Sequence, residues 1–392
     1  MCDQEEIPEV ELSESVVMAA AEEQTGCSDW GKTCVFGPAL ARYLSALEGE
    51  AQLNEQGRFG VWQGVVARLS QRLLLQQQGF DQVSTGIADR PSFVIAGLPR
   101  TGSTLLQRLL SLDPDSDSLR FGDVSMPVPA TYPGTEEDEA KIEQVGQALD
   151  KRYSQVPELR SLHEMDPRLP DEETFLINQS FMSILAPLGA HVPNFWAWVM
   201  DSGDHRGTYK ELKHLVSFVG QYRTGSRWVL KSPHHLWMQD SLLEEFPNAT
   251  VIWTHRDPVR LVPSMASLAY ALRAPASDHA TREQAGRDWL DMLSDGLTRG
   301  MSARRAAENR FIDVHYQDLM HDPQAAVAAI YTAADLDMPE AMNEAIRTFL
   351  ADNPKGKHGS HRYTAEQFGL SEGEIIEVFL DYIRTYDVVA EA

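Results

Sequence analysis

A short loop between a predicted strand and a predicted helix carries the residues best suited to bind an anion. The apolar run Phe93–Ala96 ends in Gly97, and a leucine-rich amphipathic helix begins after Gly102. The first N–H groups of a helix lack partners within the helix, and the helix dipole places partial positive charge there. A glycine that allows close approach, hydroxyl side chains and a planar cation strengthen such a site. We therefore expect this loop to bind a phosphorylated ligand through Pro99, Arg100, Thr101, Gly102, Ser103 and Thr104.

The loop lacks one residue that nucleoside-triphosphate loops require. Those loops have the sequence G-x-x-x-x-G-K-[ST], in which the lysine reaches the terminal phosphates. Gly97 and Gly102 have the required spacing, but Ser103 stands in place of the lysine. This substitution argues against ATP or GTP hydrolysis. The sequence PRTGST instead resembles the 5′-phosphosulfate-binding loop of sulfotransferases that use 3′-phosphoadenosine 5′-phosphosulfate (PAPS).

A second segment resembles another part of the same family. Apolar runs at residues 228–231 and 250–254 predict two parallel strands joined by a helix, which we expect over residues 233–245. Open α/β sheets bind ligands at the carboxyl ends of such strands. In the family, an arginine and a serine about eight residues later hold the 3′-phosphate of the nucleotide in this region. Arg256 and Ser264 match that pattern.

Two C-terminal segments extend the resemblance to roughly residues 92–372. The predicted strand 311–316 ends in a turn similar to the Y-x-D-L turn of the family, which is architectural rather than catalytic, and we include its Tyr316 among the nucleotide-binding candidates. The basic loop 353–363 is similar to a segment that closes over the nucleotide in bacterial sulfotransferases of the group that includes the tyrosyl-protein type. Because the chain as a whole is strongly acidic, a loop rich in basic side chains indicates an anion-binding segment. Its candidate residues are Lys357, His361 and Arg362.

The chemistry that the resemblance implies sets two requirements. Sulfuryl transfer needs a base for the proton of the acceptor and cations that stabilise charge on the transferring and bridging oxygens. Arg100 in the loop and Lys231 at the end of the neighbouring strand can supply the cations. This logic does not require a metal, and we expect none.

Several residues are candidates for the base. In the tyrosyl-protein type and related bacterial enzymes, a glutamate shortly after the phosphate-loop helix has this role, and here Asp123 takes its position. His235 and His234 are alternatives, because a histidine is suited to proton abstraction near neutral pH. Further residues that could line the acceptor pocket are His163, Glu172 and Glu173.

These elements predict an α/β fold with a P-loop-type parallel sheet flanked by helices. We expect an N-terminal helical extension over residues 1–90, with a flexible acidic start over residues 1–25. The α/β domain of the sulfotransferase type is expected over residues 91–392. A helical insertion at about 136–225 would form the acceptor site.

Composition restricts the partners. The 392 residues include 34 basic and 58 acidic side chains, for a net charge of −24, which disfavours binding to nucleic acid or to anionic membranes. No apolar run approaches the ~18 residues of a membrane span, and the acidic start lacks the features of a signal peptide. Three cysteines do not make a disulfide framework. We expect a cytoplasmic protein, with homodimerisation left open.

The sequence thus predicts a PAPS-dependent sulfotransferase that acts on a hydroxyl or an amine of a small-molecule or lipid-like acceptor. Aromatic residues of the middle helices could form an apolar pocket for it; they are Phe175, Phe181, Phe195, Trp196, Trp198 and Trp237. Two alternatives remain open. One is a P-loop kinase or nucleotide hydrolase whose lysine comes from elsewhere, and the other is a non-catalytic nucleotide-binding protein.

Overall fold

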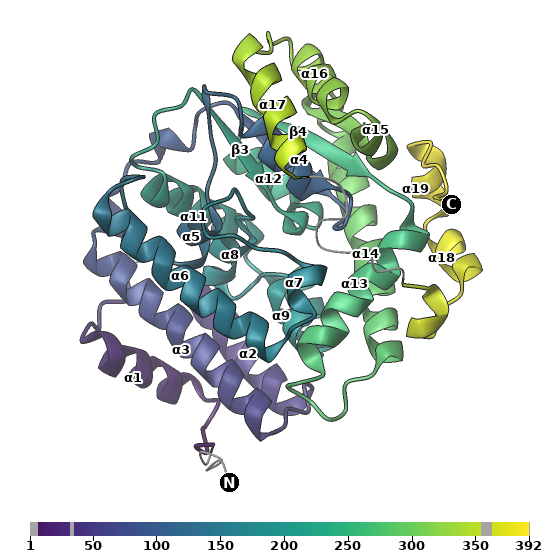
Figure 1. The fold of residues 1–392 in the computed structure, drawn as a ribbon. Coiled ribbons are helices and arrows are strands. Elements are labelled where there is room, and N and C mark those ends of the chain that lie inside the picture. The colour runs from purple at the N-terminus through teal and green to yellow at the C-terminus, as the bar shows by residue number, and fades with distance from the viewer. Residues whose placement is uncertain (1–6, 32–34, 354–362, 392) are drawn as a thin grey trace.

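A five-stranded parallel sheet forms the centre of the molecule in a computed structural model that describes residues 7–31, 35–353 and 363–391. Its strand order is β2-β3-β1-β4-β5, and neighbouring strands run in the same direction. Helices surround the sheet (Figure 1). The strands are β1 (Ser92–Gly97), β2 (Ser116–Asp117), β3 (Arg227–Lys231), β4 (Ala249–His255) and β5 (Phe311–His315). The predicted α/β fold with a helix-flanked parallel sheet is therefore confirmed.

The central strand β1 shows why the sheet is covered on both faces. All six of its residues are buried, as is typical of parallel strands between two helical layers. Because side chains alternate along a strand, Phe93 and Ile95 join one hydrophobic cluster, whereas Val94 and Ala96 join another. Each cluster is completed by side chains from a different set of helices.

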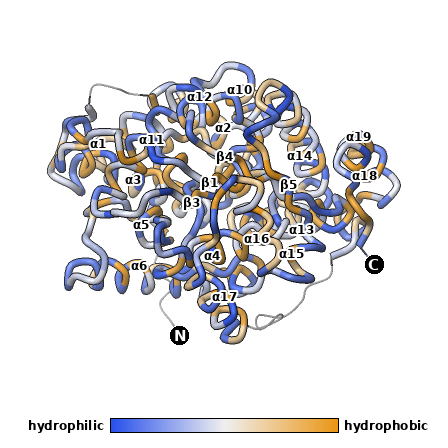
Figure 2. The backbone as a smooth tube through the Cα atoms, turned by 90° about the horizontal axis from the view of Figure 1, so that it is seen from above, coloured by the Kyte–Doolittle hydropathy of each residue, from blue (hydrophilic) through white to orange (hydrophobic). Residues whose placement is uncertain are grey.

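The smaller cluster lies under α4 (Ser103–Leu110), α16 (Pro323–Ala333) and α17 (Glu340–Asp352). Figure 2 shows these three helices together on one side of the apolar strands. The short α15 (Tyr316–His321) leads from β5 into α16. The larger cluster covers the opposite face with α12 (Gln239–Glu245), α13 (Pro258–Arg273) and α14 (Arg282–Arg305). Two further helices, α18 (Glu372–Val378) and α19 (Leu380–Thr385), follow near the C-terminus.

Helices also precede the first strand in the sequence and connect β2 to β3. The N-terminal ones are α1 (Glu14–Thr25), α2 (Phe36–Gly49) and α3 (Glu55–Gln77). Between β2 and β3 follow α5 (Phe121–Ser125), α6 (Glu136–Gln155), α7 (Leu159–Leu162), α8 (Thr174–Ile177), α9 (Leu185–Gly189), α10 (Pro193–Ser202) and α11 (His205–Val219). The expectation of a flexible start was wrong for α1, because Val17 and Ala21 are fully buried against the core. The division of the chain into domains stays a prediction.

Another expectation needs correction at the end of β3. The helix predicted over residues 233–245 is split into a 3₁₀ turn, Pro233–Leu236, and α12. The Ser232 side chain accepts a hydrogen bond from the His234 backbone N–H (3.1 Å), so the predicted cap exists but closes only the short turn. Among the described residues, no helix combines the length and the apolar character that crossing a bilayer demands.

The strand register brings four loops to one edge of the sheet. Lys231 pairs with Ile95, Gly97 with Thr254, and His255 with His315. Since parallel strands end on the same side, the segments after β1, β3, β4 and β5 open next to one another. This edge holds the site.

Gly97, at the end of β1, packs closely against β4, and a substitution can test this contact. Its φ is +112°, and an added Cβ would lie 2.8 Å from the Thr254 carbonyl oxygen and 2.8 Å from Trp253 Cδ1. We expect Gly97→Ala to lower the free energy of unfolding by about 1–3 kcal/mol. The control is Gly373→Ala in α18, where no atom lies within 4 Å of the added Cβ and alanine favours a helix. Urea unfolding of both variants measures the difference, and equal midpoints would contradict the proposed crowding.

Candidate active site

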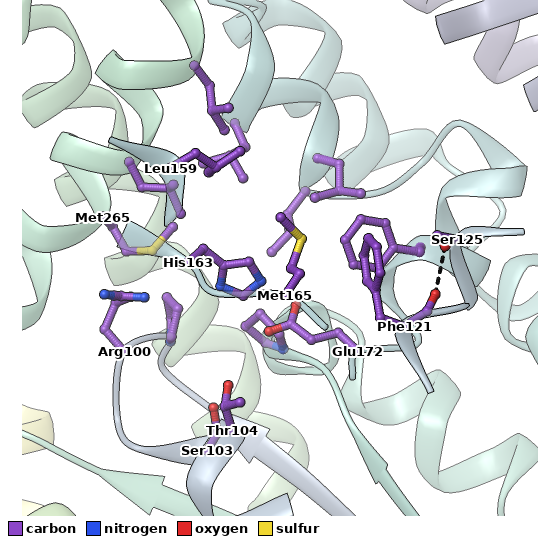
Figure 3. A pocket seen from close by; sticks show the side chains of 18 of the residues that line it. Arg100, Ser103, Thr104, Phe121, Ser125, Leu159, His163, Met165, Glu172 and Met265 are labelled. Atoms are coloured by element: carbon purple, nitrogen blue, oxygen red, sulfur yellow. Dashed lines mark hydrogen bonds between the residues drawn. The ribbon is translucent and has the colours of Figure 1, made fainter. Parts of the chain in front are cut away.

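A cavity of about 690 Å³ opens at the carboxyl edge of the sheet. One part of its wall is polar and comes from the phosphate loop, the segment Gly97–Thr104. The other part is mainly apolar and comes from α6, α9 and α13, with residues that include Val145, Leu149, Leu185, Leu188, Met265 and Leu268. Arg152 of α6 also lines the cavity. Figure 3 shows polar and apolar side chains around the same space. One chamber thus joins an anion-binding loop to an apolar pocket.

The phosphate loop has the backbone of an anion cradle. Gly102 has a φ of +80° and caps α4, and Arg100 adopts a φ of +66°, which is uncommon for a residue other than glycine. A Cβ on Gly102 would lie 3.1 Å from Leu319 and 3.3 Å from Tyr316. Glycine is therefore needed here both for its backbone conformation and for space.

The side chains of the loop divide into two groups. Pro99, Ser103 and Thr104 line the cavity together with Arg100 and Gly102. Thr101 is fully buried, and its hydroxyl donates to the Leu98 carbonyl (2.8 Å) and pairs with the Thr254 hydroxyl (2.6 Å). The Thr101 side chain therefore anchors the loop to β4.

Two arginines meet beside the loop. The Arg256 guanidinium donates to the Arg100 carbonyl oxygen (2.7 Å) and lies over the Tyr316 ring, 3.9 Å from its centroid. The Arg100 guanidinium donates to the Ser264 hydroxyl (3.1 Å), so Ser264 contacts Arg100. Burial and then the nearby charge of Arg256 lower the pKa of Arg100. A bound anion would relieve this repulsion between like charges.

The C-terminal segment also reaches Arg256. The Glu391 carboxylate accepts hydrogen bonds from Arg256 Nε (2.7 Å) and Nη2 (3.0 Å). The Glu391 backbone is held as well, because its N–H donates to Asp257 (2.9 Å) and its carbonyl accepts from Arg260 (2.9 Å). The sequence has no local signal for this contact, which joins residues 135 positions apart.

Lys231 connects the loop with the opposite wall of the cavity. Its ammonium donates to Glu172 Oε1 (2.7 Å) and to the Thr104 hydroxyl (3.4 Å), and its side chain is only 1% exposed. Burial raises the pKa of Glu172, but the charge of Lys231 and hydrogen bonds from Lys231 and Thr174 hold it below its usual value. Glu172 is therefore an ionised carboxylate in the cavity wall.

His163 faces the same space. Its imidazole lines the cavity, and one of its ring nitrogens lies with carboxylate oxygens of Asp171 and Glu172 in a group whose atoms are all within 4.8 Å of one another. A metal could in principle be held by such a group, but the Lys231 ammonium already lies 2.7 Å from Glu172 and 3.9 Å from Asp171. The two carboxylates thus face a cation supplied by the chain.

The two candidate histidines after β3 lie in the protein core. His235 is fully buried, donates from Nε2 to Glu173 Oε1 (2.7 Å) and accepts at Nδ1 from the Tyr209 hydroxyl (2.7 Å). The other oxygen of Glu173 accepts from the Lys231 backbone N–H (2.8 Å). His234 is also fully buried, and burial lowers its pKa well below the usual value. Both ring nitrogens of His235 and both carboxylate oxygens of Glu173 are engaged within the protein.

Asp123 is likewise engaged within the protein. Arg120 donates to both of its oxygens (2.8 and 3.0 Å), Arg223 donates to one (2.7 Å), and Lys141 lies 3.9 Å away. Burial raises its pKa, but the hydrogen bonds and charge of Arg120 and the charges of Arg223 and Lys141 outweigh burial and leave it lowered. The cavity is lined by Phe121 and Ser125 from the same helix and not by Asp123. These contacts favour a structural role for Asp123 over the predicted role as a base.

We therefore expect Asp123→Asn to act on stability. Breaking a buried charge cluster costs about 3–5 kcal/mol, whereas Asp150→Asn, the control, disrupts only an exposed pair with Arg160. The carboxylate of Asp123 has a lowered native pKa, so its stabilisation is complete above the unfolded pKa of about 4 and is lost as the pH falls through the native value. Urea unfolding at neutral and at acidic pH measures this, and a difference that does not shrink in acid would contradict the assignment.

The remaining predicted nucleotide-binding residues, Lys357, His361 and Arg362, lie outside the described residues.

Comparisons with known proteins identify the family of this chain. A model of the sulfotransferase family matches residues 91–340. The chain is 27% identical over 334 residues to the omega-hydroxy-beta-dihydromenaquinone-9 sulfotransferases Stf3 of Mycobacterium bovis and Mycobacterium tuberculosis, a match that covers 81% of this chain and 79% of theirs.

Solved structures support the same family. The crystal structure of sulfotransferase STF1 from Mycobacterium tuberculosis superposes with a TM-score of 0.82 at 29% identity and covers 96% of this chain and 99% of that one. Sulfotransferase STF9 from Mycobacterium avium has a TM-score of 0.88 at 23% identity, with 99% and 100% covered, and shows that the fold is shared. The family match spans most of the chain, including the phosphate loop and Arg256, and the chain therefore belongs to the sulfotransferase family, whose members transfer sulfuryl groups enzymatically.

Proposed function

We propose that this sulfotransferase takes its sulfuryl group from PAPS and transfers it to a hydroxyl of an elongated, apolar acceptor. One observation carries the proposal: a single cavity of about 690 Å³ joins the phosphate loop to an apolar chamber. This volume is in the range of about 300–1,000 Å³ that is usual for small-molecule sites. The Stf3 relatives are named for a hydroxylated menaquinone derivative, which supports a lipid-like acceptor.

The residues on the donor side fit a nucleotide with phosphates at two ends. The N-terminus of α4 and the side chains of Arg100, Ser103 and Thr104 suit the 5′-phosphosulfate, since helix N-terminal N–H groups bind anions. Arg256 is assigned to the 3′-phosphate. Residues that would accompany them are Pro99, Thr101, Gly102, Ser264 and Tyr316.

The protein's own groups prepare the transfer. PAPS supplies a sulfuryl group attached to a phosphate that can leave. Arg100 lines the cavity beside the loop, where it can stabilise negative charge that develops during transfer. Lys231 is buried behind the lining residues Thr104 and Glu172, and it adds positive charge from there. The mainly apolar wall formed by α6, α9 and α13 favours an apolar acceptor in this space.

The contact between Arg256 and Glu391 yields a test of the 3′-phosphate assignment. The Glu391 carboxylate pairs with the Arg256 guanidinium and would compete with a 3′-phosphate there. Glu391→Gln should therefore tighten binding of adenosine 3′,5′-bisphosphate severalfold. Arg256→Ala should weaken it about 10- to 100-fold, as expected for loss of a charge-assisted hydrogen bond. Glu391→Gln should leave the affinity for adenosine 5′-monophosphate unchanged. Arg256→Ala should weaken that affinity far less than the affinity for the bisphosphate, because Arg256 also holds the Arg100 carbonyl of the loop. Isothermal titration calorimetry measures these affinities.

The control variant is Glu377→Gln, an exposed residue of α18. Equal effects on both nucleotides would contradict the placement of the 3′-phosphate at Arg256. Stabilisation of the wild type by ATP with Mg²⁺ and not by the bisphosphate would instead favour the kinase alternative and reject PAPS as donor.

The acceptor pocket can be tested by narrowing it. Leu185 on α9 lines the cavity and is half-buried, so a larger side chain can enter the open space. We expect Leu185→Trp to lower kcat/KM at least tenfold for a long alcohol such as geranylgeraniol and much less for a short one such as hexanol. Transfer from ³⁵S-labelled PAPS measures both rates. The control is Leu74→Trp on α3, away from the cavity lining, and an equal loss for both alcohols would contradict an elongated acceptor.

A further inference from the structure

We propose that His163 is the catalytic base that takes the proton of the acceptor hydroxyl, assisted by the carboxylates of Asp171 and Glu172. This inference rests on the proposed transfer to a hydroxyl and assigns a role that the resemblance placed at Asp123. The proposal starts from the imidazole of His163, which lines the cavity and is not engaged in hydrogen bonds to other described residues.

The backbone holds His163 firmly while its ring faces the cavity. Its N–H donates to the Leu159 carbonyl (2.7 Å), and its own carbonyl accepts from the Tyr153 hydroxyl (3.4 Å). The ring lines the cavity, and within the described part of the chain neither of its nitrogens has a hydrogen-bond partner. Figure 3 shows the ring among Arg100, Glu172 and the loop residues Ser103 and Thr104. The His163 ring thus faces the cavity that the phosphate loop and the apolar wall share.

The charges around His163 suit a base that starts uncharged. Burial lowers its pKa, Asp171 and Glu172 oppose this, and Lys231 and Arg100 add to it, with a net result below the usual value. The ring is therefore neutral at physiological pH and has a free lone pair. A neutral base is not repelled by a highly anionic donor, whereas a free carboxylate would be.

The same surroundings stabilise the product of proton transfer. The imidazolium would lie within 4.8 Å of carboxylate oxygens of Asp171 and Glu172. Glu172 itself is engaged by Lys231 and Thr174, which occupy both of its oxygens (2.7 and 3.2 Å). Glu172 is thus placed to support the charged ring rather than to compete for the proton.

The acceptor oxygen forms a bond to sulfur while the bond between sulfur and the bridging phosphate oxygen breaks. The electron pair of the broken bond leaves with the phosphate. The hydroxyl proton passes to a ring nitrogen of His163, which becomes a cation beside the two carboxylates and later releases the proton to water.

The test compares His163→Gln with Glu172→Gln, and exposed His321→Gln serves as control. We expect His163→Gln to lower kcat about 10²- to 10⁴-fold while binding of adenosine 3′,5′-bisphosphate is unchanged. In the wild type, kcat/KM for the acceptor should fall as the pH drops through the pKa of His163, because the ring is then already protonated. This loss of activity at acidic pH, the acid limb of the profile, should be absent in His163→Gln. It should move to lower pH in Glu172→Gln, because the substitution removes a charge that raises the pKa of His163.

A second measurement separates chemistry from folding. Added imidazole should restore part of the turnover of His163→Ala and none of that of Glu172→Ala. Wild-type turnover in His163→Gln, or an acid limb that persists in it, would overturn the proposal, and loss of the limb in Glu172→Gln would make Glu172 the base. Failure of the wild type to bind the bisphosphate would overturn the proposed donor instead, which distinguishes the two claims.

Discussion

The buried ammonium of Lys231 is the interaction on which the architecture of the site depends. A charge that is 1% exposed must be neutralised within the protein, and Glu172, Asp171 and the Thr104 hydroxyl surround it. The neighbouring residues reinforce this link, because Glu173 accepts the Lys231 backbone N–H and the Thr174 hydroxyl pairs with Ser232 (2.5 Å). The segment before α8 is thereby fastened to the end of β3, and a carboxylate-bearing wall faces the phosphate loop.

Charge is distributed very unevenly in this acidic chain. The net charge is −24, yet Arg100, Lys231 and Arg256 gather at one edge of the sheet, each held by a different partner. Arg100 contacts Ser264, Lys231 contacts Glu172, and Arg256 contacts Glu391. Local focusing of positive charge can attract an anionic donor despite the overall repulsion. The Glu391 carboxylate occupies an arginine that the donor would use, so donor binding includes an exchange of one anion for another.

Much of the fold was predictable because its signals are local. The buried run of β1, the glycines at positions 97 and 102 and the leucines of α4 each identify their element within a few residues. The interruption of the helix after Ser232 was harder to predict, because His235 in that turn is held by residues distant in the sequence, Tyr209 and Glu173. Helix α1 was missed because an acidic segment becomes ordered only when its small apolar face, Val17 and Ala21, packs on the core.

By itself, the sequence determined the parallel α/β fold, the phosphate loop without a lysine, and the identity of the cations that surround it. These features depend on residue type and short spacing, which a chain carries in any conformation. Only the tertiary structure decided which side chains reach the cavity. Asp123 has the expected position in the sequence but is held by three basic residues, whereas His163 and Glu391 reach the site from segments far apart in the chain. Burial and charge pairing arise from contacts across the whole fold, and residue spacing does not encode them.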